Sequence, residues 1–584
     1  SYHFQVNLGG ILDVLSNHLY KRPDVFLREL LQNGVDAITL RQKKEPAWHR
    51  GRITISVTPG RKLVFHDNGA GLDEGEIHRF LAVIGQSSKT ALVNGTLPED
   101  YIGRFGIGLL ACFLVSDSIV VHTRPAAGGP AHVWTGHADG TYTLEPLEDC
   151  PPGTSVILTA KLGAESYFQR QTVADLVRYY GLALPVPVYL EGEDERINQI
   201  PDNFSAISRS QLLAFGQWLF EEEFLDAIPI QTSHISGVAY ILPYRTSVSA
   251  KNCHRIYLKQ MLLTEQGDTL LPAWAFFLQC FLNTRGLRPT ASREDFYEDS
   301  ALEEAREEFS GAVGRYLADL ARDDPERLRR LVEVHVEAIK SMAVWDEVLF
   351  RLFIDYLPFE TSEGVMTGVA LKKAGEGAWV SSVPKFKQLK PIFLAQGKLL
   401  LCTGYTSDEE LIAKLAHTYR LPLAPLVEDQ MDVVLELPTP EEEHRAFALL
   451  QAADRSLRPF DCQADLRCFL PHDLPALYTV SGEVQFLRQI QSAKEEKSIF
   501  SGALTSLLES VETRPLATLY LNQNSPLIRR LTRLTESALL ESAVQVLYMQ
   551  AMLAGGYPLR GGELKVLNQA LLTLLDHASG EENM

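Results

Sequence analysis

Three polar residues near the start of the chain, Glu29, Asn33 and Asp36, follow one another at helical spacing. Positions i, i+4 and i+7 share one face of an α-helix, and the apolar residues among them form a second stripe. A solvated helix face explains such a triplet. However, Asn and Asp are poor helix formers in a helix interior, and Gly34 costs about 1 kcal/mol relative to Ala. The segment 26–38 therefore predicts an amphipathic helix that keeps polar residues for a site.

A second chemical signal is Asp67, the first residue of the sequence DNGAG. Alternating apolar residues over 53–57 and 63–65 flank a Pro-Gly pair and predict a β-hairpin. Asp67 continues the inward-facing positions of the second strand, so we expect its carboxylate to be buried. Such a carboxylate accepts a hydrogen bond from an exocyclic amine such as that of adenine, and the glycines beside it let the main chain approach a flat base. A purely structural turn is the alternative interpretation.

Two further segments supply main-chain groups. The sequence GRFGIG at 103–108 opens an apolar helix expected over 107–115, and a Gly-rich loop before a helix presents N–H groups to phosphates. Gly153 and Thr154 begin a strand expected over 153–162. Each signal is weak alone, but four signals in this order within about 130 residues indicate a nucleotide site.

The types of these residues suit phosphate chemistry. An Asn side-chain oxygen completes a Mg²⁺ octahedron that phosphate oxygens and waters otherwise form. A Glu one helical turn away orients or deprotonates a water aimed at a terminal phosphate. These residue types therefore suit a nucleotide and Mg²⁺ as cofactors.

The composition places these motifs in a large protein. A chain of 584 residues exceeds what one core usually supports, so two to four domains are expected. The formal net charge of −19 argues against a nucleic-acid-binding surface. Seven cysteines without a CxxC pair argue against a structural zinc site or a disulfide scaffold. The sequence shows neither a signal peptide nor an apolar run long enough for a membrane span, so we expect a cytoplasmic protein without membrane contact.

Several segments mark the organisation of the chain. Polar, Pro-containing stretches at 190–203 and 436–445 are the candidate linkers, and 86–103 is typical of a mobile segment. The last hundred residues carry Leu and Ala at helical spacing, which predicts helices that bury a stripe against each other or against another chain.

The order of the motifs, Glu-Asn-Asp followed by DxGxG, GxxGxG and GT, resembles that of the ATP-binding superfamily shared by gyrase, heat-shock protein 90, histidine kinases and mismatch-repair ATPases. Within it, the chain resembles the bacterial type of the heat-shock protein 90 family. The similar segments are FLRELLQNGVDAI, IGRFGIGLLACFLVSDSIVV and GTSVILTAK. The segment 257–296, which includes Ser-Arg-Glu, is similar to that family's middle domain, and LYLNQNSPLIRRL is similar to its dimerisation domain.

This resemblance implies an α+β multidomain fold. An N-terminal ATPase domain with a Bergerat-type α/β sandwich is expected at 1–195, with a lid at about 82–108. An α/β middle domain that carries a catalytic Arg is expected at 204–438. A mostly helical C-terminal dimerisation domain is expected at 445–584.

The resemblance also implies ATP as the nucleotide and roles for single residues. Asn33 matches the ligand of Mg²⁺. Glu29 matches the catalytic Glu that polarises the attacking water, and Arg293 matches the middle-domain Arg that reaches the γ-phosphate. Asp67 matches the carboxylate that binds adenine, with Asp36 supporting that end of the site. The full set of expected cofactor-binding residues is Asn33, Asp36, Asp67, Gly71, Leu72, Gln86, Gly103, Arg104, Phe105, Gly106, Ile107, Gly108, Leu109 and Thr154.

The chain departs from the family pattern at a few positions. Gln86 stands where the family usually has Lys or Arg, Phe80 where it has Asn, and Arg104 where it has Gln. These departures bear on nucleotide affinity, lid closure and turnover rate, and they leave Glu29 and Asp67 in place. The sequence ends in GEENM rather than in an MEEVD-type tail, so co-chaperones that bind such a tail are not expected.

The function that these observations predict is an ATP-dependent chaperone of the heat-shock protein 90 type, which hydrolyses ATP slowly as a homodimer and acts on client proteins. Dimerisation is expected through 515–575. The alternative is a nucleotide-gated interaction scaffold with little or no hydrolysis, and a second alternative is a DNA-acting relative, which the negative charge disfavours. The amphipathic stretch 470–487 is a candidate client-binding strip, with ordinary core packing as the competing interpretation.

Overall fold

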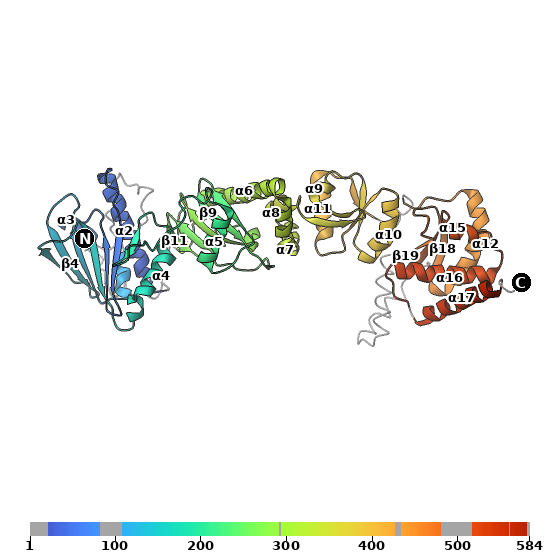
Figure 1. Cartoon of the computed structure of the whole chain (residues 1–584), viewed down its shortest axis with the longest axis horizontal. Coiled ribbons are helices and arrows are strands. Elements are labelled where there is room, and N and C mark those ends of the chain that lie inside the picture. The colour runs from blue at the N-terminus through green and yellow to red at the C-terminus, as the bar shows by residue number, and fades with distance from the viewer. Residues whose placement is uncertain are drawn as a thin grey trace, which may run out of the picture. The chain divides into compact units, whose positions relative to one another are not determined.

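The computed structural model describes residues 22–81, 108–290, 294–426, 434–480, 517–559 and 561–580. The chain divides into two compact units, Ser1–His335 and Val336–Met584 (Figure 1). Each unit contains two β-sheets with helices packed on them. This mixed, multidomain architecture confirms the predicted fold class, whereas the three domain boundaries expected from the sequence stay predictions.

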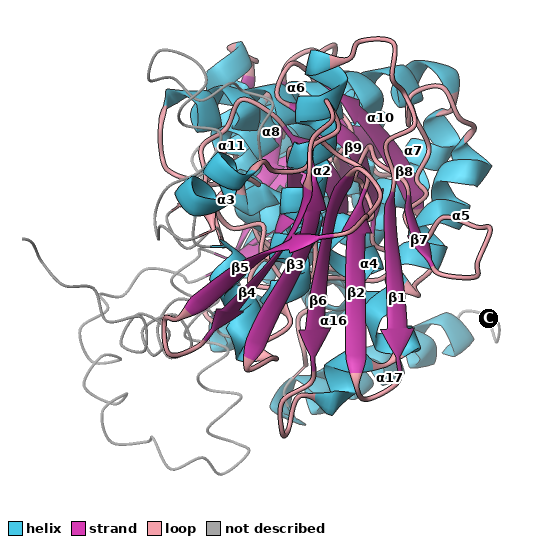
Figure 2. Cartoon of the chain, turned by 90° about the vertical axis from the view of Figure 1, so that its left-hand side faces the viewer, coloured by secondary structure: helices cyan, strands magenta, loops and turns pink. Residues whose placement is uncertain are grey.

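A seven-stranded sheet dominates the first part of unit one (Figure 2). Its strand order is β5-β4-β3-β6-β2-β1-β7, and all neighbours are antiparallel except the parallel pair β1 and β7. The strands are β1 (Ile53–Thr58), β2 (Lys62–Asp67), β3 (Ser118–Arg124), β4 (Ala131–His137), β5 (Tyr142–Leu147), β6 (Gly153–Thr159) and β7 (Val188–Leu190). The hairpin and the strand at 153–162 predicted from alternation are thereby confirmed.

Helices pack on this sheet. They are α2 (Val25–Lys44), α3 (Glu74–Phe80), the 3-10 helix η2 (Gly108–Leu114), the 3-10 helix η3 (Glu165–Phe168) and α4 (Arg170–Gly181). Helix α2 lies so close to the sheet that a Cβ atom on Gly34 would be 3.1 Å from side-chain atoms of both Ile53 and Phe65. The glycine therefore serves close packing of helix on sheet. The predicted apolar helix after GRFG is present, with 3-10 rather than α geometry.

The second sheet of unit one has the order β11-β10-β12-β9-β8. Its elements are α5 (Arg209–Phe220), β8 (Asp226–Gln231), β9 (Ile235–Ile241), β10 (Arg255–Leu258), β11 (Met261–Thr264), the 3-10 helix η4 (Ala273–Phe277), β12 (Leu278–Thr284), α6 (Ser300–Asp323) and α7 (Pro325–Ala343). The fully buried Asp226 joins these layers, because its carboxylate accepts hydrogen bonds from Arg209 Nε at 2.6 Å and from the Tyr316 hydroxyl at 2.7 Å.

The segment 190–203, a candidate linker by its composition, is mostly exposed, but Ile197 and Asn198 within it are buried. Asn198 is 2% exposed. Its side chain accepts a hydrogen bond from the Val188 amide and donates to the carbonyl oxygens of Leu184 and Val186. From the sequence alone, a buried polar residue that bonds main-chain groups cannot be told from an exposed linker residue, because its partners are not visible there.

Unit two begins within α7 and also contains two sheets. The first sheet has the order β14-β13-β16-β15-β17. The elements in this part of the chain are α8 (Glu347–Phe353), β13 (Pro358–Thr361), β14 (Gly364–Thr367), α9 (Gly368–Leu371), β15 (Gly377–Val380), α10 (Val383–Ala395), β16 (Leu399–Cys402), α11 (Asp408–Tyr419) and β17 (Leu423–Pro425). The second sheet has the order β18-β20-β19. The elements in this part of the chain are α12 (Pro440–Leu457), the 3-10 helix η6 (Arg458–Phe460), β18 (Cys462–Arg467), β19 (Ala476–Val480), β20 (Ala517–Asn522), α15 (Pro526–Leu531), α16 (Ser537–Ala554) and α17 (Gly561–Gly580).

The second candidate linker, 436–445, is largely the beginning of α12. The Thr439 hydroxyl accepts from the Glu442 amide and the Glu442 carboxylate accepts from the Thr439 amide, which forms a capping box. Pro440 takes the first helical position, where a missing N–H is harmless. The acidic residues that suggested a linker are therefore those that favour a helix N-terminus.

The C-terminal region confirms the predicted helices, to which the structure adds a three-stranded sheet. Strand β19 occupies the middle of the candidate client strip 470–487, and its Leu477 and Tyr478 are 1% and 0% exposed. Core packing is thus the correct interpretation for this strand, while 481–487 lie outside the described residues. In the parts of the chain that the structure describes, no helix has the length and apolarity that crossing a bilayer requires.

Candidate nucleotide-binding site

Glu29 lies in α2, where its side chain is 3% exposed. Its Oε1 accepts hydrogen bonds from Arg28 Nη2 at 2.9 Å and Arg28 Nε at 3.2 Å. Its Oε2 faces the beginning of η2, because a Cβ atom on Gly108 would lie only 2.4 Å from that oxygen. The guanidinium gives this buried carboxylate a partner of opposite charge, and the glycine leaves room for it.

The predicted polar stripe of α2 divides into two environments. Asp36 is 1% exposed, like Glu29 a buried polar residue, whereas Asn33 is exposed. The solvated-face interpretation is therefore wrong for Glu29 and Asp36. Asn33 follows Glu29 by one helical turn, so its amide oxygen lies on the same side of the helix.

Asp67 occupies the buried end of β2, as its place in the strand predicted, and is 5% exposed. Its Oδ1 accepts a hydrogen bond from the Gly69 amide at 2.9 Å. Burial raises the pKa of this carboxyl to about 7, and the Gly69 hydrogen bond opposes the increase. A carboxyl group with so little solvation is suited to accept a hydrogen bond from a ligand amine.

The DNGAG turn passes between α2 and the end of β3. The Ala70 amide donates to the Ala37 carbonyl at 3.0 Å, which joins the turn to the helix. Gly71 has φ of +66°, and a Cβ atom there would be 1.9 Å from the Arg124 carbonyl oxygen. Only glycine fits this position, so the turn is held at a fixed distance from Asp67.

A pair of threonines completes the wall next to Asp67. Thr154 lies opposite Asp67 in the register of β2 and β6, and its Oγ1 is 3.1 Å from Thr123 Oγ1. Thr123 Oγ1 also accepts a hydrogen bond from the Leu72 amide at 2.9 Å and contacts the Gly153 carbonyl. The structure thus brings Asp67, Gly71, Leu72 and Thr154 together. Thr123 was missed, because the sequence around it reads only as the end of a strand.

Arg41 is a second residue that the sequence analysis missed. Its Nη1 donates to the Asn68 carbonyl at 2.9 Å, and its guanidinium carbon lies 4.1 Å from the centre of the Trp48 ring. The Asn68 side chain in turn bonds the Arg52 amide and the Arg50 carbonyl. This network braces the residue that immediately follows Asp67. Its spacing in the sequence has no motif-like signature.

Several predicted residues lie outside the described part of the chain: Gln86, Gly103, Arg104, Phe105, Gly106, Ile107 and Arg293. Of the predicted phosphate loop, Gly108 and Leu109 are described, and Leu109 packs partly buried against the core of the seven-stranded sheet. The expected lid, 82–108, is therefore described only at its last residue.

The available donors fit a magnesium ion held mainly by a nucleotide. Among the described residues, no group of three His, Cys, Asp or Glu side chains forms a metal site. Mg²⁺ commonly takes one or two protein oxygens and completes its octahedron with phosphates and waters. The amide oxygen of Asn33 is suited to be such a ligand.

Comparisons with known proteins agree with this geometry. A family model described as "Histidine kinase-, DNA gyrase B-, and HSP90-like ATPase" matches residues 21–135. The chain is 25% identical to "Chaperone protein HtpG" of Oleidesulfovibrio alaskensis, over 95% of this chain and 94% of that protein. It is 23% identical to "Chaperone protein HtpG" of Chlorobium luteolum, over 65% of this chain and 64% of that protein.

A mitochondrial protein gives a similar match. The chain is 24% identical to "TNF receptor-associated protein 1 homolog, mitochondrial" of Dictyostelium discoideum, over 62% of this chain and 54% of that protein. The chain therefore spans nearly all of one relative and less than two thirds of the other two. The family match covers α2, the β1–β2 hairpin and η2, the elements that carry Glu29, Asp67 and Gly108.

Proposed function

The chain belongs to the bacterial type of the heat-shock protein 90 family, and from this premise we propose that it is an ATP-dependent molecular chaperone that acts on bound client proteins and hydrolyses ATP slowly. The observation that carries the proposal is the arrangement of two differently treated carboxylates on one sheet-and-helix scaffold. One is paired with a guanidinium, and the other is nearly unsolvated beside a glycine turn.

Asp67 is proposed to accept a hydrogen bond from the adenine amino group. Thr154 and Thr123 support this end of the site, because Thr154 on β6 lies opposite Asp67 and its hydroxyl is 3.1 Å from that of Thr123 on β3. Gly71 and the Leu72 amide define how closely a flat base approaches. Asp36, which lies in α2 with Glu29, is proposed to support the adenine-binding end of the site as well.

Glu29 is proposed to orient the attacking water and to receive its proton at a carboxylate oxygen as the water attacks the γ-phosphate. Its contact with Arg28 holds the carboxylate in one position, and a fixed position is what makes such a base effective. Mg²⁺, bound through Asn33, would neutralise phosphate charge. Gln86 and the loop of Gly103, Arg104, Phe105, Gly106, Ile107, Gly108 and Leu109 are proposed to contact the phosphates.

Arg293 is proposed to stabilise charge on the γ-phosphate from the part of the chain that carries the five-stranded sheet of unit one. A guanidinium suits this role because its planar donors match phosphate oxygens. If residues 82–108 close as a lid and Arg293 docks only then, hydrolysis depends on domain movement and is slow.

The C-terminal helices are proposed to form a homodimer. Exposed leucines on α17 recur at helical spacing, and Leu553 of α16 is exposed as well. The α17 residues are Leu564 at 46%, Leu571 at 39%, Leu572 at 54% and Leu575 at 63% exposure. A stripe of this kind on a long helix favours association with a second copy.

Steady-state hydrolysis and nucleotide binding test the proposal together. We expect slow, Mg²⁺-dependent hydrolysis of ATP by the wild type. Glu29→Gln should abolish turnover and retain binding measured by calorimetry, whereas Asp67→Asn should lose binding. Arg293→Ala should lower turnover at unchanged affinity. The matched control is Glu195→Gln, an exposed Glu of the same unit.

Two results would contradict the assignments. Equal loss of affinity in the Glu29 and Asp67 variants would show that the two carboxylates do not have separate roles. Clear nucleotide binding by a wild type that never hydrolyses ATP would instead favour the nucleotide-gated scaffold.

A further inference from the structure

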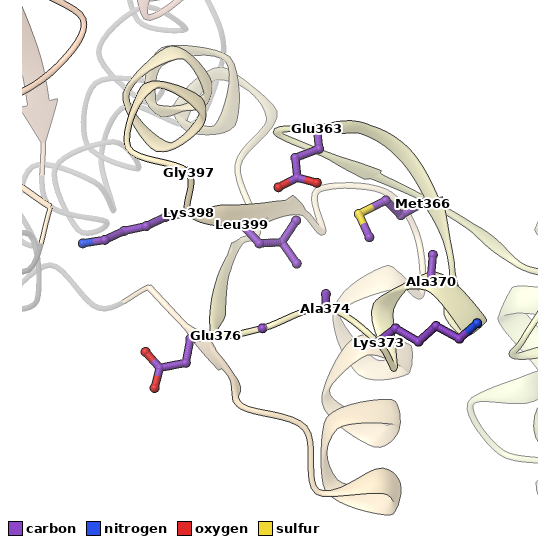
Figure 3. A pocket seen from close by; sticks show the side chains of 10 residues that line it. Glu363, Met366, Ala370, Lys373, Ala374, Glu376, Gly397, Lys398 and Leu399 are labelled. Atoms are coloured by element: carbon purple, nitrogen blue, oxygen red, sulfur yellow. The ribbon is translucent and has the colours of Figure 1, made fainter.

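A cavity of about 510 Å³ lies in unit two, and the described residues that line it fall between 363 and 399 (Figure 3). Its lining is mixed, with apolar side chains on one part and the charged residues Glu363, Lys373, Glu376 and Lys398 on the rest. Figure 3 shows the side chains of Met366 on β14 and Leu399 on β16 pointing into the space. Ala370 and Ala374 also line it, and their small side chains leave it open.

One carboxylate faces the space beside Met366 and Leu399. Figure 3 shows the Glu363 carboxylate directed into the cavity, whereas Lys373, Glu376 and Lys398 point away from it. Among the described residues, Glu363 forms no ion pair. Lys373 and Lys398 line the same cavity but are directed away from this carboxylate, and a negative charge left unpaired in this way favours a cationic ligand.

The main chain around Glu363 is firmly held, so the carboxylate is presented from a fixed turn. The Glu363 amide donates to Thr361 Oγ1 at 3.1 Å. The adjoining Ser362 is 2% exposed. It exchanges hydrogen bonds with Leu400, because its amide donates to the Leu400 carbonyl and its Oγ accepts from the Leu400 amide. These contacts join the β13–β14 turn to β16.

Strand β14 adds a second feature, the edge of a sheet. It is the terminal strand in the order β14-β13-β16-β15-β17. Val365, next to the inward-pointing Met366, is 72% exposed. An exposed terminal strand is a template on which an extended chain adds its own strand, and neighbouring side chains of that chain then fall alternately toward and away from the cavity.

We propose that this cavity and the edge of β14 together bind an extended client segment that contains Arg or Lys between apolar residues. The aliphatic stem of the basic side chain would lie over Met366 and Leu399, with its charged end at Glu363. The formal net charge of −19 attracts basic segments over longer distances. The described residues that line the cavity include no aromatic side chain, which disfavours a stacked heteroaromatic ligand.

The identification of the occupant as a client segment rests on the proposed chaperone function, but the binding test does not use nucleotide. A short fluorescein-labelled peptide with a central Leu-Arg-Leu is the probe, and its fluorescence anisotropy is measured with the full-length protein. Peptides with Gln or Glu in place of Arg are compared with it. The variants are Glu363→Gln, Glu363→Lys and, as matched control, Glu376→Lys, because Glu376 lies at the same cavity and points away from it.

We expect the Arg peptide to bind best and the Glu peptide worst. Glu363→Lys should weaken the Arg peptide about tenfold, since it replaces attraction by like-charge repulsion, and Glu376→Lys should change little. The advantage of Arg over Gln should also shrink as salt is added. Circular dichroism of each variant verifies the fold, and Met366→Ser offers an independent, uncharged change to the same cavity that should weaken every peptide.

Three outcomes would overturn the proposal. The first is no peptide binding by the wild type, and the second is equal affinity of the Arg peptide for the wild type and Glu363→Lys. The third is displacement of the peptide by arginine amide at equal concentration, because the occupant would then be a small cation. Hydrolysis of ATP is measured on the same samples. A wild type that binds the peptide but does not hydrolyse ATP would refute the proposed ATPase function, whereas binding of a basic peptide at this cavity would still hold.

Discussion

Two buried carboxylates in this protein are treated in opposite ways, and the difference separates their roles. Glu29 receives two hydrogen bonds from the Arg28 guanidinium. Asp67 receives one from a main-chain amide, and burial raises the pKa of Asp67 to about 7. The two acids therefore differ in their partners, a guanidinium for Glu29 and a single main-chain amide for Asp67. Glu29 is thus prepared for water and Asp67 for a ligand donor.

The raised pKa of Asp67 leads to a prediction about stability. The folded protein binds this proton more tightly than the unfolded chain, so stability decreases as pH rises from about 4 to about 7. Asp67→Asn removes the effect. At pH 8 the variant should therefore be more stable than the wild type without nucleotide, by a few kcal/mol at most, and near pH 4 the two should agree.

Urea unfolding at several pH values measures this difference, with nucleotide binding measured on the same variant. A wild type whose stability relative to Asp67→Asn does not change between pH 4 and pH 8 would contradict the raised pKa. Gain of stability together with loss of binding would identify Asp67 as a residue kept for its ligand.

Arg41 acts on the site through the turn after Asp67 and is a positioning residue. Its hydrogen bond to the Asn68 carbonyl and its stacking on Trp48 hold that turn. Arg41→Ala should raise the KM for ATP several-fold and leave kcat unchanged, because the base-binding end loosens while Glu29 stays in place.

Initial rates over a range of ATP concentrations distinguish this role from a general loss of fold. Trp48→Phe keeps an aromatic surface and should behave nearly as the wild type, which makes it the matched control. A fall in kcat at constant KM would show that Arg41 does not act on the base-binding end.

At the scale of elements, η2 depends on a glycine at its first residue. A Cβ atom on Gly108 would lie 2.4 Å from Glu29 Oε2, and Arg28 limits how far that carboxylate moves aside. Gly108→Ala should therefore lower kcat by up to about a hundredfold, since displacement of a catalytic group by about 1 Å has this effect.

Turnover and thermal unfolding of the same samples test this expectation. Gly75→Ala in α3 is the control, because a Cβ atom there meets only Asp73 Oδ1 at 3.4 Å. Undiminished kcat in Gly108→Ala would show that Glu29 is free to adjust. A lower melting temperature without a change in kcat would assign the glycine to packing alone.

Thr290 and Asp295, which lie on either side of Arg293 in the chain, are joined to each other by a hydrogen bond. Thr290 donates to the Asp295 carbonyl at 2.8 Å, and the Asp295 carboxylate accepts from the Phe296 amide and from Thr269 Oγ1. Asp295→Ala should lower turnover about tenfold at unchanged nucleotide affinity, because the proposed γ-phosphate contact loses its support.

Single-turnover rates and calorimetry separate these two quantities. Asp268→Ala changes an exposed neighbour that forms a surface ion pair with Lys251, and serves as control. If Asp295→Ala weakened nucleotide binding as much as turnover, Asp295 would have a general structural role instead.

At the scale of the whole molecule, the proposed dimer depends on α17. Leu572→Glu combined with Leu575→Glu places two charges in the exposed leucine stripe. Sedimentation should change from a dimer to a monomer of 65.1 kDa, and the specific rate of ATP hydrolysis should fall with it. Gln569→Glu, an exposed change outside the leucine stripe, should leave the dimer intact. A double variant that still sediments as a dimer would place the interface elsewhere.

Local pattern in the sequence determined much of this protein. The spacing of apolar residues in 26–38 predicted α2, and alternation around Pro59-Gly60 predicted the hairpin that ends at Asp67. Alternation also predicted that Asp67 points inward, because side chains of a strand alternate strictly. The order of the motifs was sufficient to indicate the family. These features depend on neighbours in the chain, which a sequence displays directly.

Tertiary structure decided the rest, since it depends on which distant segments meet. Composition made 436–445 look like a linker, whereas the capping box at Thr439 shows it to be a helix start. Nothing local to Thr123 or Arg41 indicated a part in the site, because their partners come from other strands and helices. Burial of Glu29 against Gly108 likewise joins α2 to η2. The sequence by itself determined which groups the site contains, and only the packing of remote elements decided how dry, how close and how firmly held those groups are.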